Sequence, residues 1–332
     1  MTYIINVKDY GAVGNDLVDD GPAIQSAIDA AFGSAGSPNG TNAHLNKPLY
    51  FPNGTYAVAS PLVLTRVRGA HIYGAGQEST KIKATSASVA VVQTNGLEYC
   101  CFEDMSFTGN VSASDVAFDL DWNGTGSVGL KGNIFTNCSF GSADYGLRIG
   151  FSGNGGINNQ FYGCYFAANT VAGLVAWSAS AVTNSVQGGG ASENATAFWA
   201  RNGQIISVND AGMANNTQDF LIDSAYPMLI KGNRTESAVM CIQNHVNSCI
   251  VIEGTAGVAS VNEFCRPKGK VIIDSCTTDG NANSGAGAFL CTSGSYTGIV
   301  YIRGCYFPGT SSTATPWTHF LTGFAGTVGQ NI

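Results

Sequence analysis

The segment Phe102-Glu103-Asp104-Met105-Ser106-Phe107 recurs along the chain and decides the fold. Close copies run from Phe135 to Phe140, from Phe161 to Phe166 and from Ile302 to Phe307. Weaker copies begin at Val186, Val208, Ile230, Ile252 and Ile273, and earlier ones at Phe51 and Ile72. Successive starts are 21 to 33 residues apart, a period typical of repeat architectures.

From the copy that begins at Phe102 onward, a second large apolar residue lies 12 to 18 residues after the first residue of each copy, and these residues form a second column. Its members are Phe118, Leu147, Leu174, Phe198, Phe220, Ile242, Phe264, Phe289 and Phe320. Two aligned columns with loops of variable length predict an all-β solenoid of about eleven rungs around one hydrophobic axis. Met105, Cys138, Cys164, Cys276 and Cys305 share one rung position. We expect these cysteines to be reduced, buried, small hydrophobic residues rather than a metal or redox site.

The amino-terminal segment reads as a cap. Ile24, Ala27, Ile28 and Ala31 follow helical spacing, Asp20 is placed to cap that helix, and Pro22 lies in its first turn. The sequence therefore predicts a single domain with a cap over residues 1–48, a coil over 49–324 and a tail over 325–332.

Composition excludes several classes of function. The 332 residues carry a net charge of −7, and only 11% are charged, so neither a nucleic-acid-binding stripe nor a disordered polyelectrolyte is expected. No apolar run approaches the ~20 residues of a membrane helix, so no membrane insertion is expected. The first residues resemble no secretory signal. Neither a metal site nor a cofactor is predicted.

Four segments carry a resemblance to a known family. Val7–Ala12 and Ala23–Ile28 resemble the entry segment of the pectate-lyase-like superfamily of right-handed parallel β-helices, and Phe51–Tyr56 and Ile72–Gly76 look like its next two rungs. The superfamily includes polysaccharide lyases, glycoside hydrolases, epimerases and the tailspike depolymerases of bacteriophages. The resemblance implies that the short helix caps the coil. It also implies a homotrimer that works outside the cell or on a virion, without a signal peptide.

Alternation along the strands predicts which side chains face outward. With the second column facing inward, one outer face carries Asp119, Asp121, Arg148, Val175, Trp177, Trp199, Arg201, Asp219, Leu221, Asp223, Gln243 and His245. Tryptophan offers an apolar plane to a sugar ring, and arginine can bind a carboxylate with two hydrogen bonds. We expect Trp177, Trp199, Arg201, Arg148 and His245 to bind a polysaccharide or oligosaccharide.

Asp219, Asp223 and Glu236 are the candidate catalytic carboxylates, because glycoside hydrolysis uses a pair of acids. A single acid of this kind is more often a solvated or turn-capping residue. The sequence favours a glycoside hydrolase that acts on extracellular or capsular polysaccharide. A non-catalytic glycan-binding fibre and a polysaccharide lyase, with Arg201 or His245 in the proton transfer, remain the alternatives.

Overall fold

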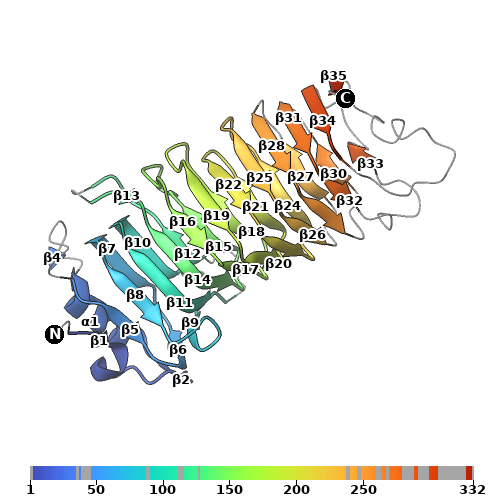
Figure 1. Cartoon of the computed structure of the whole chain (residues 1–332). Helices are drawn as coiled ribbons and strands as arrows, with labels where there is room; N and C mark the ends of the chain where they lie inside the picture. Colours follow the sequence, from blue (N-terminus) through green and yellow to red (C-terminus); the bar gives the residue numbers. More distant parts are fainter. Residues whose placement is uncertain are drawn as a thin grey trace.

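The computed structural model describes most of the chain. The described residues are 3–34, 37–38, 46–86, 90–110, 116–125, 128–236, 240–244, 248–258, 263–266, 269–278, 288–290, 299–305 and 327–330. Parallel strands stack along one long axis, with the amino terminus at one end and the carboxyl terminus at the other (Figure 1). The chain is thus a parallel β-solenoid, and the predicted fold class is confirmed.

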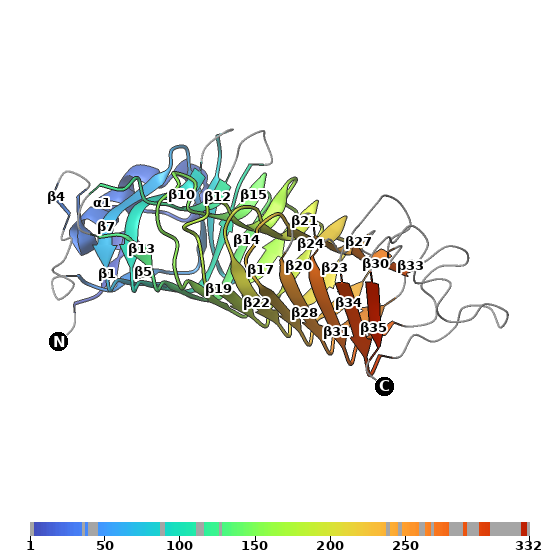
Figure 2. The ribbon, with the colours of Figure 1, turned by 90° about the horizontal axis from the view of Figure 1, so that it is seen from above.

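Three faces of stacked strands surround the core. Seen from above, in Figure 2, the strands of the third face lie apart from those of the other two. The strands of the first face pair in the order β1 (Ile5–Asn6), β5 (Leu49–Phe51), β8 (His71–Gly74), β11 (Cys101–Thr108), β14 (Ile134–Gly141), β16 (Gln160–Tyr162), β19 (Asn184–Gln187), β22 (Ile205–Asn209), β25 (Met228–Lys231), β28 (Cys249–Glu253), β31 (Lys270–Asp274), β34 (Ile299–Arg303) and β35 (Thr327–Gln330).

The second face continues from the first round a corner, and β11 and β14 are long enough to serve both. Its other strands are β2 (Asn15–Asp19), β6 (Gly54–Val58), β9 (Thr80–Ala84), β17 (Tyr165–Ala167), β20 (Gly190–Ser192), β23 (Gly212–Ala214), β26 (Arg234–Glu236), β29 (Ala256–Val258) and β32 (Thr277–Thr278).

The third face is a separate sheet. Its strands pair in the order β7 (Leu62–Arg68), β10 (Ala90–Glu98), β12 (Val116–Leu120), β15 (Tyr145–Ile149), β18 (Ala172–Ala176), β21 (Thr196–Ala200), β24 (Gln218–Ile222), β27 (Met240–Asn244), β30 (Glu263–Arg266) and β33 (Ala288–Leu290). The short strand β13 (Leu130–Lys131) also pairs with β10.

The register confirms most of the predicted repeat. All eleven predicted starts lie in strands β5 to β34 of the first face, and from Ile72 to Ile302 each start pairs with the next. The first start is off by two residues, because Ile72 pairs with Leu49 and not with Phe51. Strands β1 and β35 extend the face, so the number of rungs differs slightly from eleven.

The second predicted column is correct from Phe118 to Ile242 and wrong beyond it. Ile242 pairs with Cys265 instead of Phe264, and Cys265 pairs with Leu290 instead of Phe289. A one-residue shift of this kind exchanges the two faces of a strand. Phe320, the last predicted member of this column, lies outside the described residues, as does Phe307 at the end of the last repeat copy.

The cap forms as predicted, with one difference. A 3-10 turn, η1 (Val7–Tyr10), precedes helix α1 (Gly21–Phe32), and the apolar face of α1 is buried. Asp20 occupies the N-cap position, but its carboxylate makes no cap hydrogen bond. It accepts hydrogen bonds from the backbone N–H groups of Val13 and Gly14 instead. An antiparallel pair, β3 (Gly33–Ser34) with β4 (Ser37–Pro38), follows α1.

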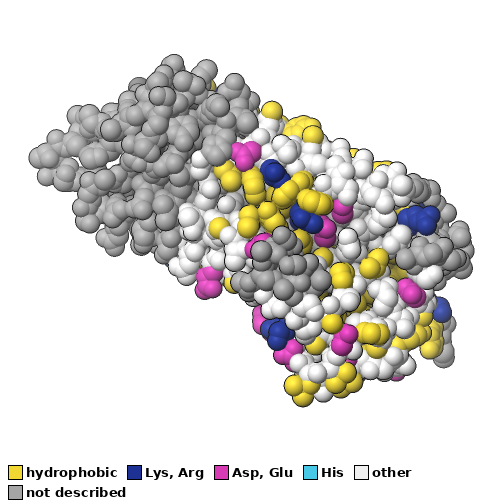
Figure 3. All heavy atoms as spheres, turned by 180° about the vertical axis from the view of Figure 1, so that it is seen from behind, with side chains coloured by type: hydrophobic (Ala, Val, Ile, Leu, Met, Phe, Trp, Pro, Cys, Tyr) yellow, Lys and Arg dark blue, Asp and Glu magenta, His cyan; other side chains and the backbone are white. Residues whose placement is uncertain are grey.

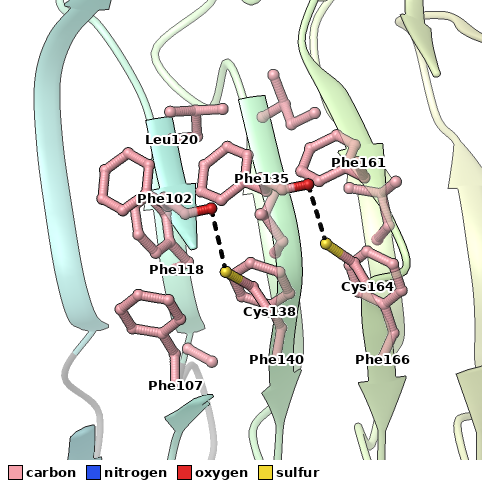
Figure 4. Packing of buried hydrophobic residues seen from close by; sticks show 14 of the residues in the cluster. Phe102, Phe107, Phe118, Leu120, Phe135, Cys138, Phe140, Phe161, Cys164 and Phe166 are labelled. Carbon is pink, nitrogen blue, oxygen red and sulfur yellow. Dashed lines mark hydrogen bonds between the residues drawn. The ribbon is translucent and has the colours of Figure 1, made fainter. Parts of the chain in front are cut away.

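Rows of stacked phenylalanine rings fill the core (Figure 4). Phe135 lies parallel to Phe102 at a ring-centroid distance of 4.8 Å and to Phe161 at 5.1 Å. Cys138 and Cys164 are buried beside these rings, and each thiol donates a hydrogen bond to a backbone carbonyl of the preceding rung. Burial raises the pKa of the neighbouring-rung Cys100 to about 12. These thiols therefore pack as small hydrophobic residues, as expected, whereas Cys305 at the same rung position is only partly buried.

Two rows of buried asparagines line the corners, which the sequence analysis missed. Asn133, Asn159 and Asn184 form one row, in which each side-chain amide donates to the next at 2.9 and 2.8 Å. Asn169, Asn194 and Asn216 form the other, at 2.8 and 2.9 Å. The same asparagines also bond the backbone of neighbouring rungs, which satisfies most of the buried polar groups at the corners. The exception in these rows is the Oδ1 atom of Asn169, which has no hydrogen-bond partner. No helix in the described part of the chain is long and apolar enough to cross a membrane.

Candidate functional site

An aromatic surface lies on the outside of the third face, where β15, β18, β21 and β24 stack. It consists of Tyr145, Arg148, Phe151, Trp177, Trp199, Arg201 and Asp223. Figure 3 views the molecule from the side opposite to Figure 1. There, basic side chains lie among hydrophobic ones near the middle of the molecule, with acidic side chains beside them.

Trp177 and Trp199 are neighbours on successive rungs. Trp199 lies in β21, Trp177 directly follows β18, and their ring centroids are 6.4 Å apart at 60°. Both side chains are partly exposed. Trp177 also contacts Tyr145 and Phe151 edge to face, at 5.5 and 5.3 Å. Alternation along the strand thus placed both tryptophans correctly. Tyr145 was missed because it is two residues before the inward-facing Leu147, and Phe151 because it lies in a turn without a repeat signal.

Arg201 stacks on the tryptophans and has no acidic partner. Its guanidinium carbon lies 3.7 Å from the ring centroid of Trp177 and 5.5 Å from that of Trp199, both within cation–π range. Among the described residues, no carboxylate forms an ion pair with Arg201. Its Nη1 atom is buried without a hydrogen-bond partner.

Arg148, one rung before Trp177, is fully paired. Its Nε and Nη2 atoms donate to the two oxygens of Asp119 at 3.0 and 2.8 Å, and its guanidinium covers Phe151 at 3.8 Å. Burial raises the pKa of Asp119, and the hydrogen bonds from Arg148 offset part of that rise. Asp121 is also buried and accepts a hydrogen bond from the backbone N–H of Ser152 at 2.9 Å. Both acids were predicted to face outward, but neighbouring side chains cover them.

Asp223 is the partly exposed carboxylate of the aromatic surface. It follows β24, and its Oδ2 atom accepts a hydrogen bond from the indole Nε1 of Trp199 at 2.8 Å. In the strand register it lies one rung beyond Arg201, since the N–H groups of both residues bond the preceding strand at equivalent places. The structure therefore brings Asp223 into contact with Trp199 and one rung from Arg201.

Two other predicted residues do not lie at this surface. Asp219 was predicted to face outward, and this is wrong, because its side chain has no solvent exposure. It lies where the chain has just rounded a corner into β24, and it accepts a hydrogen bond from the Asn216 amide at 3.1 Å. Alternation fails here because the strand register passes from Gln218 to Phe220 without pairing Asp219. Val175, also predicted outward, is buried between Arg148 and Trp199 in the register.

Glu236 lies on a different face. It belongs to β26 of the second face and forms an ion pair with Arg234 at 2.6 Å. His245 lies outside the described residues. No group of three or more His, Cys, Asp or Glu side chains that could hold a metal ion occurs in the described part of the chain.

Comparisons with known proteins agree with the fold. Residues 4–100 match the family model described as rhamnogalacturonase A/epimerase, pectate lyase-like. Mannuronan C5-epimerase AlgE2 of Azotobacter vinelandii is 43% identical over 83 residues, which are 24% of this chain and 7% of that protein. The chain therefore spans only a small part of the curated relatives that it matches.

Solved structures extend the similarity over nearly the whole chain. The N-terminal fragment of gene product 12 of bacteriophage Phi29 has a TM-score of 0.63 at 13% identity, and the match covers 91% of this chain and 62% of that one. The tailspike protein of Escherichia coli bacteriophage HK620, solved with a pentasaccharide, has a TM-score of 0.57 at 10% identity, with 98% and 65% covered. The resemblance to pectate-lyase-like β-helices is confirmed, and at these identities it concerns the fold alone.

Proposed function

We propose that this chain binds an extracellular polysaccharide on its aromatic surface. One arrangement carries the proposal, namely the partly exposed pair of Trp177 and Trp199 with the guanidinium of Arg201 stacked against them. A cluster of aromatic side chains that stays in contact with water marks an interaction site more often than a structural one. Sugar rings have apolar faces that fit indole planes and hydroxyl groups that fit the polar atoms beside them.

Replacing Trp177 tests this proposal. Trp177→Ala removes the ring at the centre of the surface, and central aromatic residues of an interface typically contribute about 2 kcal/mol or more to binding. We expect binding to weaken about 30-fold or more, measured on an array of bacterial capsular and extracellular polysaccharides. Trp199→Ala, on the next rung, should have a similar effect.

Trp122→Ala is the matched control. Trp122 is partly buried, packs against the core and bonds its indole N–H to the Thr125 carbonyl. Within the described residues, no aromatic ring contact joins it to the aromatic surface. This variant should bind as the unaltered chain does, and thermal unfolding should show that all three variants are folded. Binding that persists in both Trp177→Ala and Trp199→Ala would disprove the proposed surface.

Glycoside hydrolysis at the same surface is the second candidate function. The position of Asp223 favours it, because this carboxylate is partly exposed, accepts a hydrogen bond from Trp199 and lies one rung beyond Arg201. Hydrolysis requires a second carboxylate about 5–5.5 Å away for retention or about 6.5–9.5 Å away for inversion. Asp219 and Glu236 are the predicted partners, one at a buried corner and the other on the second face. Their catalytic roles stay predictions, and polysaccharide lysis remains the alternative chemistry.

We also propose that the protein works on a phage particle. The likeness of its fold to two bacteriophage proteins supports this part of the proposal. The homotrimer stays a prediction, and light scattering combined with size-exclusion chromatography would test it.

A further inference from the structure

We propose that the saccharide bound by the aromatic surface is acidic, and that Arg201 binds its carboxylate. This inference rests on the proposed polysaccharide binding and names the substrate class. It starts from a contrast between the two arginines of the surface, which the sequence alone presents as equivalent.

The positive charge of Arg148 is already neutralised within the protein. Its Nε and Nη2 atoms donate to the two oxygens of Asp119, so the pair of N–H groups that could bind a ligand carboxylate is already occupied. Its side chain is 14% exposed, and that of Asp119 is 6% exposed. Arg148 therefore serves as a support for Phe151 and Trp177 rather than as a free anion site.

The charge of Arg201 is not neutralised by any described carboxylate. The guanidinium lies over the Trp177 ring, and the residue is only partly exposed. A buried N–H donor without an acceptor is unfavourable, and hydrogen bonds to a charged partner are the strongest remedy. The Nη1 atom of Arg201 is such a donor. A carboxylate that approaches the exposed part of the guanidinium would supply the missing counter-charge, and the unpartnered Nη1 atom shows that the protein itself leaves this group short of an acceptor.

The turn beside Arg201 contains a second unsatisfied polar atom. Ser178 directly follows Trp177, and its Oγ atom is buried without a hydrogen-bond partner. This turn packs closely against the one that follows Arg201, since a Cβ atom on Gly203 would lie only 2.6 Å from the Ser178 carbonyl oxygen. The Asn202 amide also donates to the Trp177 carbonyl at 3.2 Å. The two turns thus hold Trp177 and Arg201 close together. They also leave two polar atoms, Ser178 Oγ and Arg201 Nη1, without a hydrogen-bond partner.

The overall charge of the chain argues against unspecific attraction of a polyanion. A net charge of −7 repels an acidic polymer at long range. Affinity for such a polymer must therefore come from a local, partly buried contact. A contact of that kind is screened by salt much less than exposed charges are, so binding should persist in 1 M salt, where the Debye length is about 3 Å.

The experiment compares acidic polysaccharides with the same polymers after chemical reduction of their carboxyl groups. The probes are polymannuronate, polygalacturonate and a panel of acidic bacterial exopolysaccharides, with dextran as a neutral polymer. We expect at least one acidic polymer to bind and its reduced form to bind about 10- to 100-fold more weakly. Arg201→Gln should weaken binding of the acidic form by the same factor and leave the reduced form unaffected.

Arg303→Gln is the matched control, because it changes the net charge equally at an arginine that is paired with Asp274 on the first face. Arg201→Lys keeps the charge but loses the planar fork, so it should bind the acidic polymer with intermediate affinity. If reduced polymers bind as tightly as acidic ones and binding still requires Trp177, the inference about Arg201 fails while the proposed function stands. If no polymer of the panel binds, both are overturned.

Discussion

Asp223→Asn is expected to abolish release of reducing ends from any polysaccharide that the protein hydrolyses. A carboxylate that transfers a proton in glycoside cleavage contributes about 10²- to 10⁴-fold to the rate, and an amide of the same shape cannot take that role. Asp223 is the partly exposed carboxylate that the structure places beside Trp199 and Arg201. The measurement is a reducing-end assay on the polymer identified by the binding array, with mass spectrometry of the products.

Binding should survive this substitution. The asparagine amide oxygen can still accept the hydrogen bond from the Trp199 indole, so the aromatic surface should keep its shape and its affinity within a few-fold. Glu253→Gln is the control, since Glu253 lies on the first face in an ion pair with Lys231. Full activity in Asp223→Asn would move the chemistry elsewhere, and Glu236→Gln would then be the next variant to assay. Products with an unsaturated end would indicate a lyase instead.

If the unaltered chain binds its polysaccharide and releases no product, the protein is a binding protein alone. That outcome agrees with the geometry of the surface, where Asp119 and Asp121 are committed to Arg148 and Ser152. Asp223 would then serve to orient Trp199 rather than to transfer protons. The binding array and the reducing-end assay therefore separate the two candidate functions without requiring a second structure.

The repeat was predictable because stacked strands impose a shared pattern on distant residues. Phe102, Phe135 and Phe161 pair in register, so the periodicity of the sequence is the periodicity of the core. The prediction failed where a rung departs from the pattern. Phe264 stands at the expected offset from its start, but the register places Cys265 opposite Ile242. Because Phe264 and Cys265 are both apolar, the sequence does not distinguish the two registers.

The corners were the least predictable part of the fold. Asn133, Asn159 and Asn184 each precede a rung start by two residues, which is a signal that could have identified their row. In a chain this rich in asparagine, the signal is easily missed. The prediction for Asp219 was wrong at one of these corners. Strand alternation predicted an outward carboxylate, whereas that carboxylate is buried and accepts a hydrogen bond from Asn216.

The site was predictable in its residue types but not in its pairing. Alternation placed Trp177, Trp199 and Arg201 on one outer surface, as the structure has them. Which arginine pairs with an acidic residue depends on the strand register and on the conformation of each side chain, neither of which can be read from the sequence. Arg148 meets Asp119 directly because the two residues are register partners on β12 and β15. Asp223 lies one rung beyond Arg201, but its Oδ2 atom accepts a hydrogen bond from the Trp199 indole, and no ion pair joins it to Arg201 within the described part of the chain.

Phe135→Ala is expected to have the largest effect on stability. The Phe135 ring is fully buried and contacts four others, lying parallel to Phe102 and Phe161 and edge to face with Phe118 and Phe140. Truncating a buried phenylalanine removes its hydrophobic contribution and leaves a cavity, which together lower the free energy of unfolding by about 3–5 kcal/mol. Because strands on both sides hold the backbone in register, the site can collapse only partly, so we expect the upper part of this range. Chemical unfolding followed by circular dichroism would measure the change.

Tyr162→Ala is the comparison for this prediction. Tyr162 follows Phe161 directly in β16 but points outward, and its side chain is 40% exposed. It should lower the free energy of unfolding by about 1 kcal/mol or less, as most exposed substitutions do. In a solenoid each rung contacts only its neighbours, so a weakened rung can unfold separately from the rest. A second transition in Phe135→Ala, absent from Tyr162→Ala, would show that the coil divides at this rung. Equal small changes in both variants would mean that the stacked phenylalanines do not hold the coil together.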